Sequence, residues 1–307
     1  MYYAQGRTME AIAGALGTSR STVSRMLREA RATGIVEITL RSPGTPRREE
    51  IGERIADRYG VRVEVAPRGP GESETQRLRS VADRAARRID EILQPDMTIG
   101  IAWGTTTSAI VDHLRPRGLS GLQMVQLNGS INTEGAGLEY VSMVLDRASS
   151  VWGARVHHFP VPAFFDFPET KAALWRERSV QHVLRMQERC RLAVFSVGAF
   201  DAEVPSHVHA SGYLAAEDLA ALRADGAVAD VCTVFLRADG TWDGVRMNAR
   251  CSGPDPARLA RIPRRLLVAA GQRKAVPLRA ALLAGTATDV VVDETTGAAL
   301  LALDDAA

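Results

Sequence analysis

The chain has 307 residues, a formal net charge of +2 and 46% hydrophobic residues. One hydrophobic core seldom serves so long a chain, so we expect a small domain and a large one. The three cysteines form neither a close metal-binding pair nor a disulfide framework, and no apolar run is long enough to span a membrane. These features exclude a disulfide scaffold and a membrane-spanning protein, and they predict a soluble, cytoplasmic protein with no metal and no cofactor.

Positive charge gathers at the N-terminal end. The first 48 residues contain eight arginines and three glutamates, whereas the remainder of the chain is slightly acidic. A basic module on a nearly neutral body is typical of a protein that contacts a polyanion through that module alone.

Residues 8–31 predict two short helices joined by a tight turn. Thr8 suits the N-cap of the first helix, and Gly17 can adopt the left-handed conformation that ends it. Ser19 offers a second N-cap. The second helix then has an apolar stripe at helical spacing, formed by Val23, Met26, Leu27 and Ala30. This pattern indicates a helix-turn-helix.

The opposite face of the second helix is polar and basic. Its candidate DNA contacts are Ser19, Arg20, Ser21, Thr22, Ser24, Arg25 and Arg28. An arginine-rich helix face is often only a solvated surface. The glycine at the turn, the hydroxyl-rich helix start and the position at the chain end favour a recognition helix that enters the major groove of double-stranded DNA.

Residues 35–40 alternate between apolar and polar side chains, which predicts a short strand that forms a wing or a cap on the small domain. A segment rich in proline, glycine and arginine follows. We therefore expect a DNA-binding domain over residues 1–41, a linker over 42–50 and a large domain over 51–307.

The large domain alternates between apolar strands and amphipathic helices. The expected strands cover residues 61–66, 97–102, 122–127, 156–161, 192–197, 266–269 and 290–293. The expected helices include one long helix over 169–188 and shorter ones over 274–283 and 296–303. Strands separated by helices of this length predict an α/β fold of Rossmann-like type, with a mainly parallel sheet covered on both faces.

Polar residues follow several of these strands, where an open α/β sheet binds ligands. Residues 104–107 (Gly-Thr-Thr-Thr) begin a helix and can hold phosphate or sugar oxygens, although a threonine-rich helix cap is an equally good explanation. Gln126 and Asn128 suit hydroxyl groups. Lys274, which follows Gly271 and is one of two lysines in the chain, can neutralise a phosphate or can be an ordinary surface lysine.

With these motifs in order, the chain resembles the SorC/DeoR type of sugar-binding transcriptional regulators. The resemblance rests on the helix-turn-helix, WGTTTS (residues 103–108), LNGS (127–130), GAVADVC (226–232) and the segment 268–301. It implies a large domain similar in fold to sugar-phosphate isomerases, glucosamine-phosphate deaminases and CoA transferases. It also implies a sugar, sugar-phosphate or polyol effector, a carbohydrate catabolic operon as target, and a homodimer or homotetramer on operator DNA.

The resemblance also implies an effector site after the strands. Its residues would be Gly104, Thr105, Thr106, Thr107, Gln126, Asn128, Gly129, Asp230, Gly271 and Lys274. The alternative is a sugar-phosphate isomerase or deaminase, which requires a positioned base. Asp230, Asp293 and Glu294 are candidates for that base, but none belongs to a paired acid/base motif, and a helix-turn-helix has no role in catalysis. A scaffold protein would not need the polar strand ends.

Overall fold

The computed structural model describes residues 1–32, 48–67, 69, 71–131, 136–200 and 213–306. The chain forms two compact units, Met1–Thr45 and Pro46–Ala307. The expected wing strand over residues 35–40 lies outside the described residues. Helix α4 begins at Arg48, so the first turn of this helix falls within the segment expected to be linker.

Within residues 1–32 the N-terminal unit contains three helices, α1 (Tyr2–Gln5), α2 (Met9–Ala15) and α3 (Arg20–Ala32). Local hydrogen bonds explain where α2 and α3 begin. The backbone N–H of Ala11 donates to the Thr8 hydroxyl at 3.2 Å, and that of Thr22 donates to the Ser19 hydroxyl at 3.2 Å. Gly17 has a φ of 61° in the turn between the helices. The predicted caps and turn are therefore confirmed.

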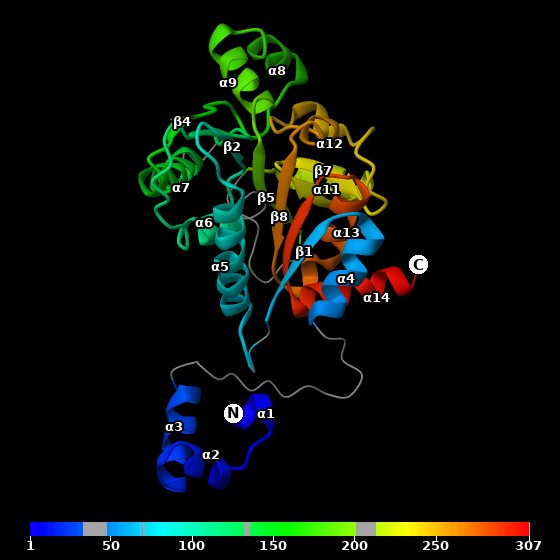
Figure 1. Ribbon diagram of the computed structural model, residues 1–307. Helices are drawn as coiled ribbons and strands as arrows, with labels where there is room; N and C mark the ends of the chain where they lie inside the picture. Colours follow the sequence, from blue (N-terminus) through cyan, green and yellow to red (C-terminus); the bar gives the residue numbers. More distant parts are fainter. Residues whose placement is uncertain (33–47, 68, 70, 132–135, 201–212, 307) are drawn as a thin grey trace. The chain divides into compact units, whose positions relative to one another are not determined.

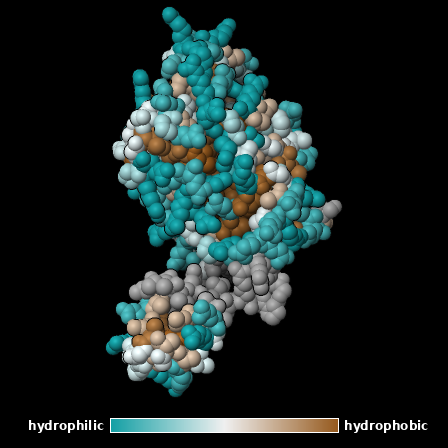
Figure 2. Space-filling view, in the orientation of Figure 1, coloured by the Kyte–Doolittle hydropathy of each residue, from teal (hydrophilic) through white to brown (hydrophobic). Residues whose placement is uncertain are grey.

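The small core of this unit is formed by Ile12, Ala13 and Val23. The predicted apolar stripe on α3 is only partly buried, since Met26 is 52% exposed. Hydrophobic side chains of this unit accordingly reach the surface among hydrophilic ones (Figure 2).

Over its described residues the second unit is built on a nine-stranded sheet, and the prediction of a mainly parallel sheet is confirmed. The main path has the order β1-β9-β8-β5-β2-β3-β4, and all its neighbouring strands run parallel. A hairpin of β6 and β7 pairs antiparallel with the end of β5. The strands are β1 (Arg62–Ala66), β2 (Thr98–Ile101), β3 (Gln123–Gln126), β4 (Arg155–His157), β5 (Leu192–Gly198), β6 (Ala227–Val231), β7 (Val234–Arg237), β8 (Arg264–Ala269) and β9 (Asp289–Asp293).

Helices cover both faces of this sheet (Figure 1). On one face α5 (Glu74–Ile92), α6 (Thr105–Val111) and α7 (Ala136–Trp152) enclose one hydrophobic cluster. On the other face lie α4 (Arg48–Tyr59), α9 (Arg178–Glu188), α13 (Ala275–Leu283) and α14 (Glu294–Asp305). The described part of the unit also has α8 (Pro168–Leu174), α11 (Ala216–Ala224), α12 (Pro256–Leu259) and the 3₁₀ segments η1 (Arg246–Arg250) and η2 (Gln272–Lys274). In the described part of the chain, no helix has the length and apolarity that a membrane crossing requires.

The single long helix predicted over residues 169–188 is wrong. The chain forms α8 and α9 instead, with a break at residues 175–177. The ring of Trp175 packs edge-on against Phe159 and Phe165, with centroids 5.6 Å away in both cases. The Gln181 amide also donates to the Trp175 carbonyl at 2.6 Å, which satisfies an acceptor at the end of α8.

The strand predicted over residues 156–161 is shorter than expected and ends at His157. Beyond it, the backbone N–H of Phe159 donates to the Gln126 side chain at 3.0 Å rather than to a neighbouring strand. The β6–β7 hairpin was not predicted, because Asp230 interrupts the apolar run of β6 and the turn residues Cys232 and Thr233 are not typical of a two-residue hairpin.

Candidate functional site

A pocket lies at the carboxyl edge of the sheet and encloses about 630 Å³, its open mouth included. Strand ends supply most of its walls, as expected for an open α/β sheet. The residues that line it are Glu74, Leu78, Ala102–Thr106, Asn128, Ser196–Gly198, Asp230, Cys232, Thr233, Ala270 and Lys274.

Lys274 provides the positive charge of this pocket. Its ammonium group donates to the hydroxyl of Thr106 at 3.3 Å and to that of Ser196 at 3.4 Å, and these two hydroxyls are 3.1 Å apart. Burial lowers the pKa of Lys274 to about 8, although the nearby carboxylates of Asp230 and Glu74 raise it. The lysine therefore carries its charge below about pH 8 and can meet an anion there.

Two buried carboxylates face the same pocket, and each has a glycine beside it. A Cβ atom at Gly198 would lie 1.9 Å from Asp230 Oδ1, and one at Gly271 would lie 1.9 Å from Glu74 Oε1. Gly271 also has a φ of 106°, which favours glycine. Both glycines thus leave the space that the carboxylates occupy. Carboxylates in such positions can accept hydrogen bonds from sugar hydroxyl groups.

The tip of the β6–β7 hairpin has a backbone conformation that is rare for its residues. Cys232 and Thr233 have φ values of 50° and 71°, and both side chains line the pocket. A two-residue hairpin of this type favours glycine or asparagine, and positive φ is especially unfavourable for a β-branched residue such as threonine. Gly253 makes room for this tip, since a Cβ there would lie 1.7 Å from the Cys232 carbonyl oxygen. Strain of this kind is concentrated at functional sites.

Asn128 contributes a buried amide to the pocket. It is 1% exposed, and its Oδ1 accepts no hydrogen bond from any residue that the structure describes. The loop that carries it is held by the Gln126 amide and the Trp103 indole, which donate to the Asn128 carbonyl at 2.7 and 3.2 Å. A ligand hydroxyl can donate to this free Oδ1.

Six of the ten predicted effector contacts line the pocket: Gly104, Thr105, Thr106, Asn128, Asp230 and Lys274. The other four do not. Thr107 is buried within α6, and Gln126 is bonded inside the wall. Gly129 lies against the Val161 and Pro162 carbonyls, 2.4 Å from where its Cβ would be. Gly271 serves the site indirectly, through the space that it leaves for Glu74.

Sequence reasoning missed several residues of the pocket, among them Glu74, Trp103, Ser196 and Thr233. Ser196 was detectable, since it is a polar residue near the end of an apolar strand. Glu74 gives no such signal, because it lies in the first turn of α5 and reaches the strand ends only through packing of this helix on the sheet.

Asp230, Asp293 and Glu294, the candidates for the base of an enzyme, lie in different places. Asp293 caps α14 by accepting from the backbone N–H groups of Thr295 and Thr296 at 2.9 and 3.0 Å. It also accepts from the backbone N–H of Gly271 at 3.0 Å. Neither Asp293 nor Glu294 lines the pocket. Asp230 is the one member of this predicted set found there.

Some of the candidate DNA contacts at α3 have partners within the N-terminal unit, and the others are described by their exposure. The Ser19 hydroxyl caps the helix and lies 2.7 Å from that of Ser21 and 2.9 Å from that of Thr22. Arg20 forms an exposed ion pair with Glu10 at 3.2 Å. Ser24 is partly exposed, whereas Arg25 and Arg28 are exposed.

Comparison with known proteins agrees with this architecture. Residues 47–302 match the family described as "Putative sugar-binding domain". A solved domain of "a possible sugar-binding transcriptional regulator" from Arthrobacter aurescens TC1 is 42% identical, with a TM-score of 0.79, and the match covers 85% of this chain and 100% of that one.

Two further relatives match almost the whole chain. The deoxyribonucleoside regulator of Bacillus subtilis (strain 168) is 26% identical over 301 residues, which are 98% of this chain and 95% of that protein. The full-length sorbitol operon regulator SorC of Klebsiella pneumoniae shares the fold, with 22% identity, a TM-score of 0.72 and coverage of 98% and 96%. All three relatives are named as regulators, and the first as a transcriptional regulator. The chain therefore belongs to the sugar-binding domain family and is a transcriptional regulator of the SorC/DeoR type.

Proposed function

We propose that this regulator binds a sugar phosphate or a phosphorylated polyol in the carboxyl-edge pocket, and that the effector controls the binding of α3 to operator DNA. The observation that carries the proposal is the cluster of Lys274, Thr106 and Ser196 inside the pocket. One ammonium and two hydroxyls suit phosphate oxygens. Asp230, Glu74 and Asn128 are acceptors suited to sugar hydroxyls.

The relatives support a carbohydrate effector in general terms. Their names refer to a deoxyribonucleoside, to a sorbitol operon and, for a Brucella abortus relative, to erythritol catabolism. We infer that this chain likewise controls a carbohydrate catabolic operon. We also propose that it acts as a homodimer or homotetramer, because a symmetric oligomer presents two recognition helices to a palindromic operator.

The pocket can be tested with a matched pair of threonine substitutions. A thermal-shift panel of sugar phosphates and their unphosphorylated forms should yield a stabilising compound, and saturation at one hundred times its Kd contributes about 2.7 kcal/mol. Thr106→Val removes a hydroxyl from the pocket and should abolish this shift. Thr107→Val makes the same change one residue further on, outside the pocket, and should preserve it. An intact response in Thr106→Val would refute the site, and a response to the unphosphorylated form alone would refute the phosphate.

The DNA-binding helix can be tested separately. Arg25→Ala removes an exposed cation from α3 and should weaken binding to DNA from upstream of the regulated genes by about 1–3 kcal/mol. Arg54→Ala deletes an exposed arginine from the other unit and serves as the control. Fluorescence anisotropy at several salt concentrations measures both variants. Equal affinities in the two variants would remove α3 from the DNA interface.

A further inference from the structure

A second pocket lies at the opposite edge of the sheet, where β2, β5 and β8 begin. Its charged lining residues are Arg88, Glu91, Asp96, Arg189, Arg191 and Arg264, four cations against two anions. None of the residues that line the first pocket lines this one.

Two of these arginines lie at the starts of neighbouring strands, and both line this pocket. Arg191 directly precedes β5, and Arg264 is the first residue of β8. The backbone N–H of Arg264 donates to the Arg191 carbonyl at 3.2 Å, and the N–H of Arg191 donates to the Thr98 carbonyl at 2.9 Å. Because β5 lies between β2 and β8, these bonds connect the first residues of three neighbouring strands. Backbone pairing therefore fixes the backbones of the two arginines at the edge of one pocket.

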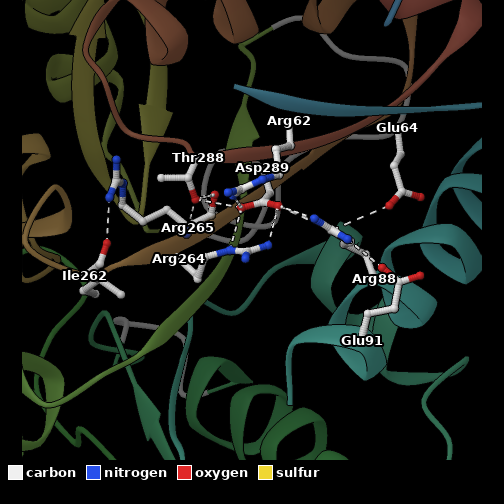
Figure 3. Close-up of polar contacts among 9 residues, drawn as sticks. All are labelled: Arg62, Glu64, Arg88, Glu91, Ile262, Arg264, Arg265, Thr288 and Asp289. Atoms are coloured by element: carbon white, nitrogen blue, oxygen red, sulfur yellow. Dashed lines mark hydrogen bonds and ion pairs between the residues drawn. The ribbon is translucent and has the colours of Figure 1, made fainter. Parts of the chain in front are cut away.

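A buried carboxylate orients two guanidinium groups at this edge, those of Arg264 and Arg88 (Figure 3). Asp289, whose side chain is 2% exposed, accepts from Arg264 at 2.7 and 3.0 Å and from Arg88 at 2.9 Å. Arg88 also pairs with Glu91 at 2.6 Å, so its donors are largely used. Arg264 contacts Asp289 through Nε and Nη2, which leaves Nη1 available.

Positive charge remains uncompensated on the rim of this pocket. Arg189 and Arg191 are both exposed, and neither side chain has a hydrogen bond or ion pair with the residues that the structure describes. Like charges that line one pocket repel each other. An anion shared by Arg189, Arg191 and Arg264 would remove this repulsion.

We propose that the amino edge of the sheet is a second anion site, which takes a phosphate group with two or more negative charges. The planar guanidinium group binds phosphate oxygens through paired N–H donors, and Asp289 orients one such group in advance. The phosphate belongs either to a free polyphosphate or phosphate ester, or to the backbone of bound DNA. This site is independent of the carboxyl-edge pocket, which we call the effector pocket.

Calorimetry with inorganic pyrophosphate at low ionic strength tests the proposal. The full chain with Lys274→Met provides the background, because this change removes the cation of the effector pocket. Pyrophosphate should bind this protein, and adding Arg191→Gln should weaken binding about tenfold or more. Adding Arg185→Gln, an exposed arginine of α9 that lines neither pocket, should leave binding unchanged. Arg189→Gln replaces Arg191→Gln if the latter lowers the Tm of the unliganded protein.

Absence of pyrophosphate binding, or equal weakening by Arg185→Gln, would overturn the site. A parallel titration with duplex DNA of unrelated sequence identifies the source of the phosphate. If the site binds the DNA backbone, Arg191→Gln lowers DNA affinity and reduces its salt dependence. If the site binds a free phosphate compound, Arg191→Gln loses pyrophosphate binding and keeps full DNA affinity.

Discussion

At the scale of single residues, Lys274 supplies the positive charge among the described residues that line the effector pocket. Its ammonium lies between two hydroxyls that it can share with a ligand and two carboxylates that stabilise it. Burial lowers the pKa of this lysine to about 8, so its charge changes close to physiological pH. A phosphate ester loses its second proton at about pH 6, so it already carries two negative charges at about pH 8, where the lysine loses its charge.

Effector affinity should therefore depend on pH through Lys274. Below about pH 8 the lysine is protonated and attracts the phosphate, whereas above this value the ligand must bind a neutral amine or drive proton uptake. We expect the Kd for the sugar phosphate to rise by up to about tenfold per pH unit above pH 8. Calorimetry between pH 6.5 and 9.5 measures this, with Lys274→Met as the control that should bind weakly at every pH. A flat profile in the wild type would show that Lys274 does not contact the effector phosphate.

At the scale of secondary structure elements, Asp289 joins four segments at the start of β9. It binds Arg264 of β8 and Arg88 of α5, and Arg62 of β1 lies 3.7 Å away. Burial opposes ionisation of this carboxyl, but hydrogen bonds from Arg264, Arg88 and Thr288 outweigh it and lower the pKa of Asp289. The ion pair therefore stabilises the amino edge of the sheet at neutral pH.

Asp289→Asn should destabilise the protein by about 2–4 kcal/mol, because it leaves two oriented guanidinium groups without their anion. Since the folded-state pKa of Asp289 is lowered, its stabilisation is present above the unfolded value near 4 and is lost as pH falls through the folded-state pKa. The wild type and Asp289→Asn should thus converge in stability in acid. Urea unfolding at pH 7 and at stepwise lower pH measures this difference.

Asp305→Asn is the matched control for that experiment. It breaks an exposed ion pair with Arg54 and should change stability by less than about 1 kcal/mol. Equal losses of unfolding free energy in the two variants would show that the buried Asp289 ion pairs stabilise the protein no more than an exposed pair does.

At the scale of the whole molecule, control requires that effector and DNA binding affect each other. The two units fold around separate cores, and the effector pocket belongs wholly to the second. Coupling therefore requires two states of the protein that the effector and the DNA bind with different affinities.

We expect saturating effector to change the Kd for operator DNA by about 5- to 150-fold. Linkage then requires that saturating operator DNA change the effector Kd by the same factor. Anisotropy and calorimetry measure the two factors, and Lys274→Met should show neither change. Equal DNA affinity with and without effector would show that ligand binding in the pocket does not control DNA binding.

The elements predicted from the sequence are those that local chemistry controls. Thr8, Gly17 and Ser19 act on residues within four positions of themselves, so their capping and turn roles followed from the sequence alone. The break at Trp175 did not, because it depends on contacts with Phe159 and Phe165. No local pattern separates this segment from one continuous helix.

The same distinction applies to the sites. Polar residues after apolar strands, such as Thr106, Asn128 and Lys274, could be recognised because parallel strands bring their carboxyl ends to one edge. Glu74, the space beside Gly198 and the row of arginines at the amino edge depend on strand order and register, which join residues far apart in the chain. Sequence by itself determined the fold class, the helix-turn-helix and six of the residues that line the pocket. Tertiary structure alone decided which carboxylates and cations meet, because long-range packing places them.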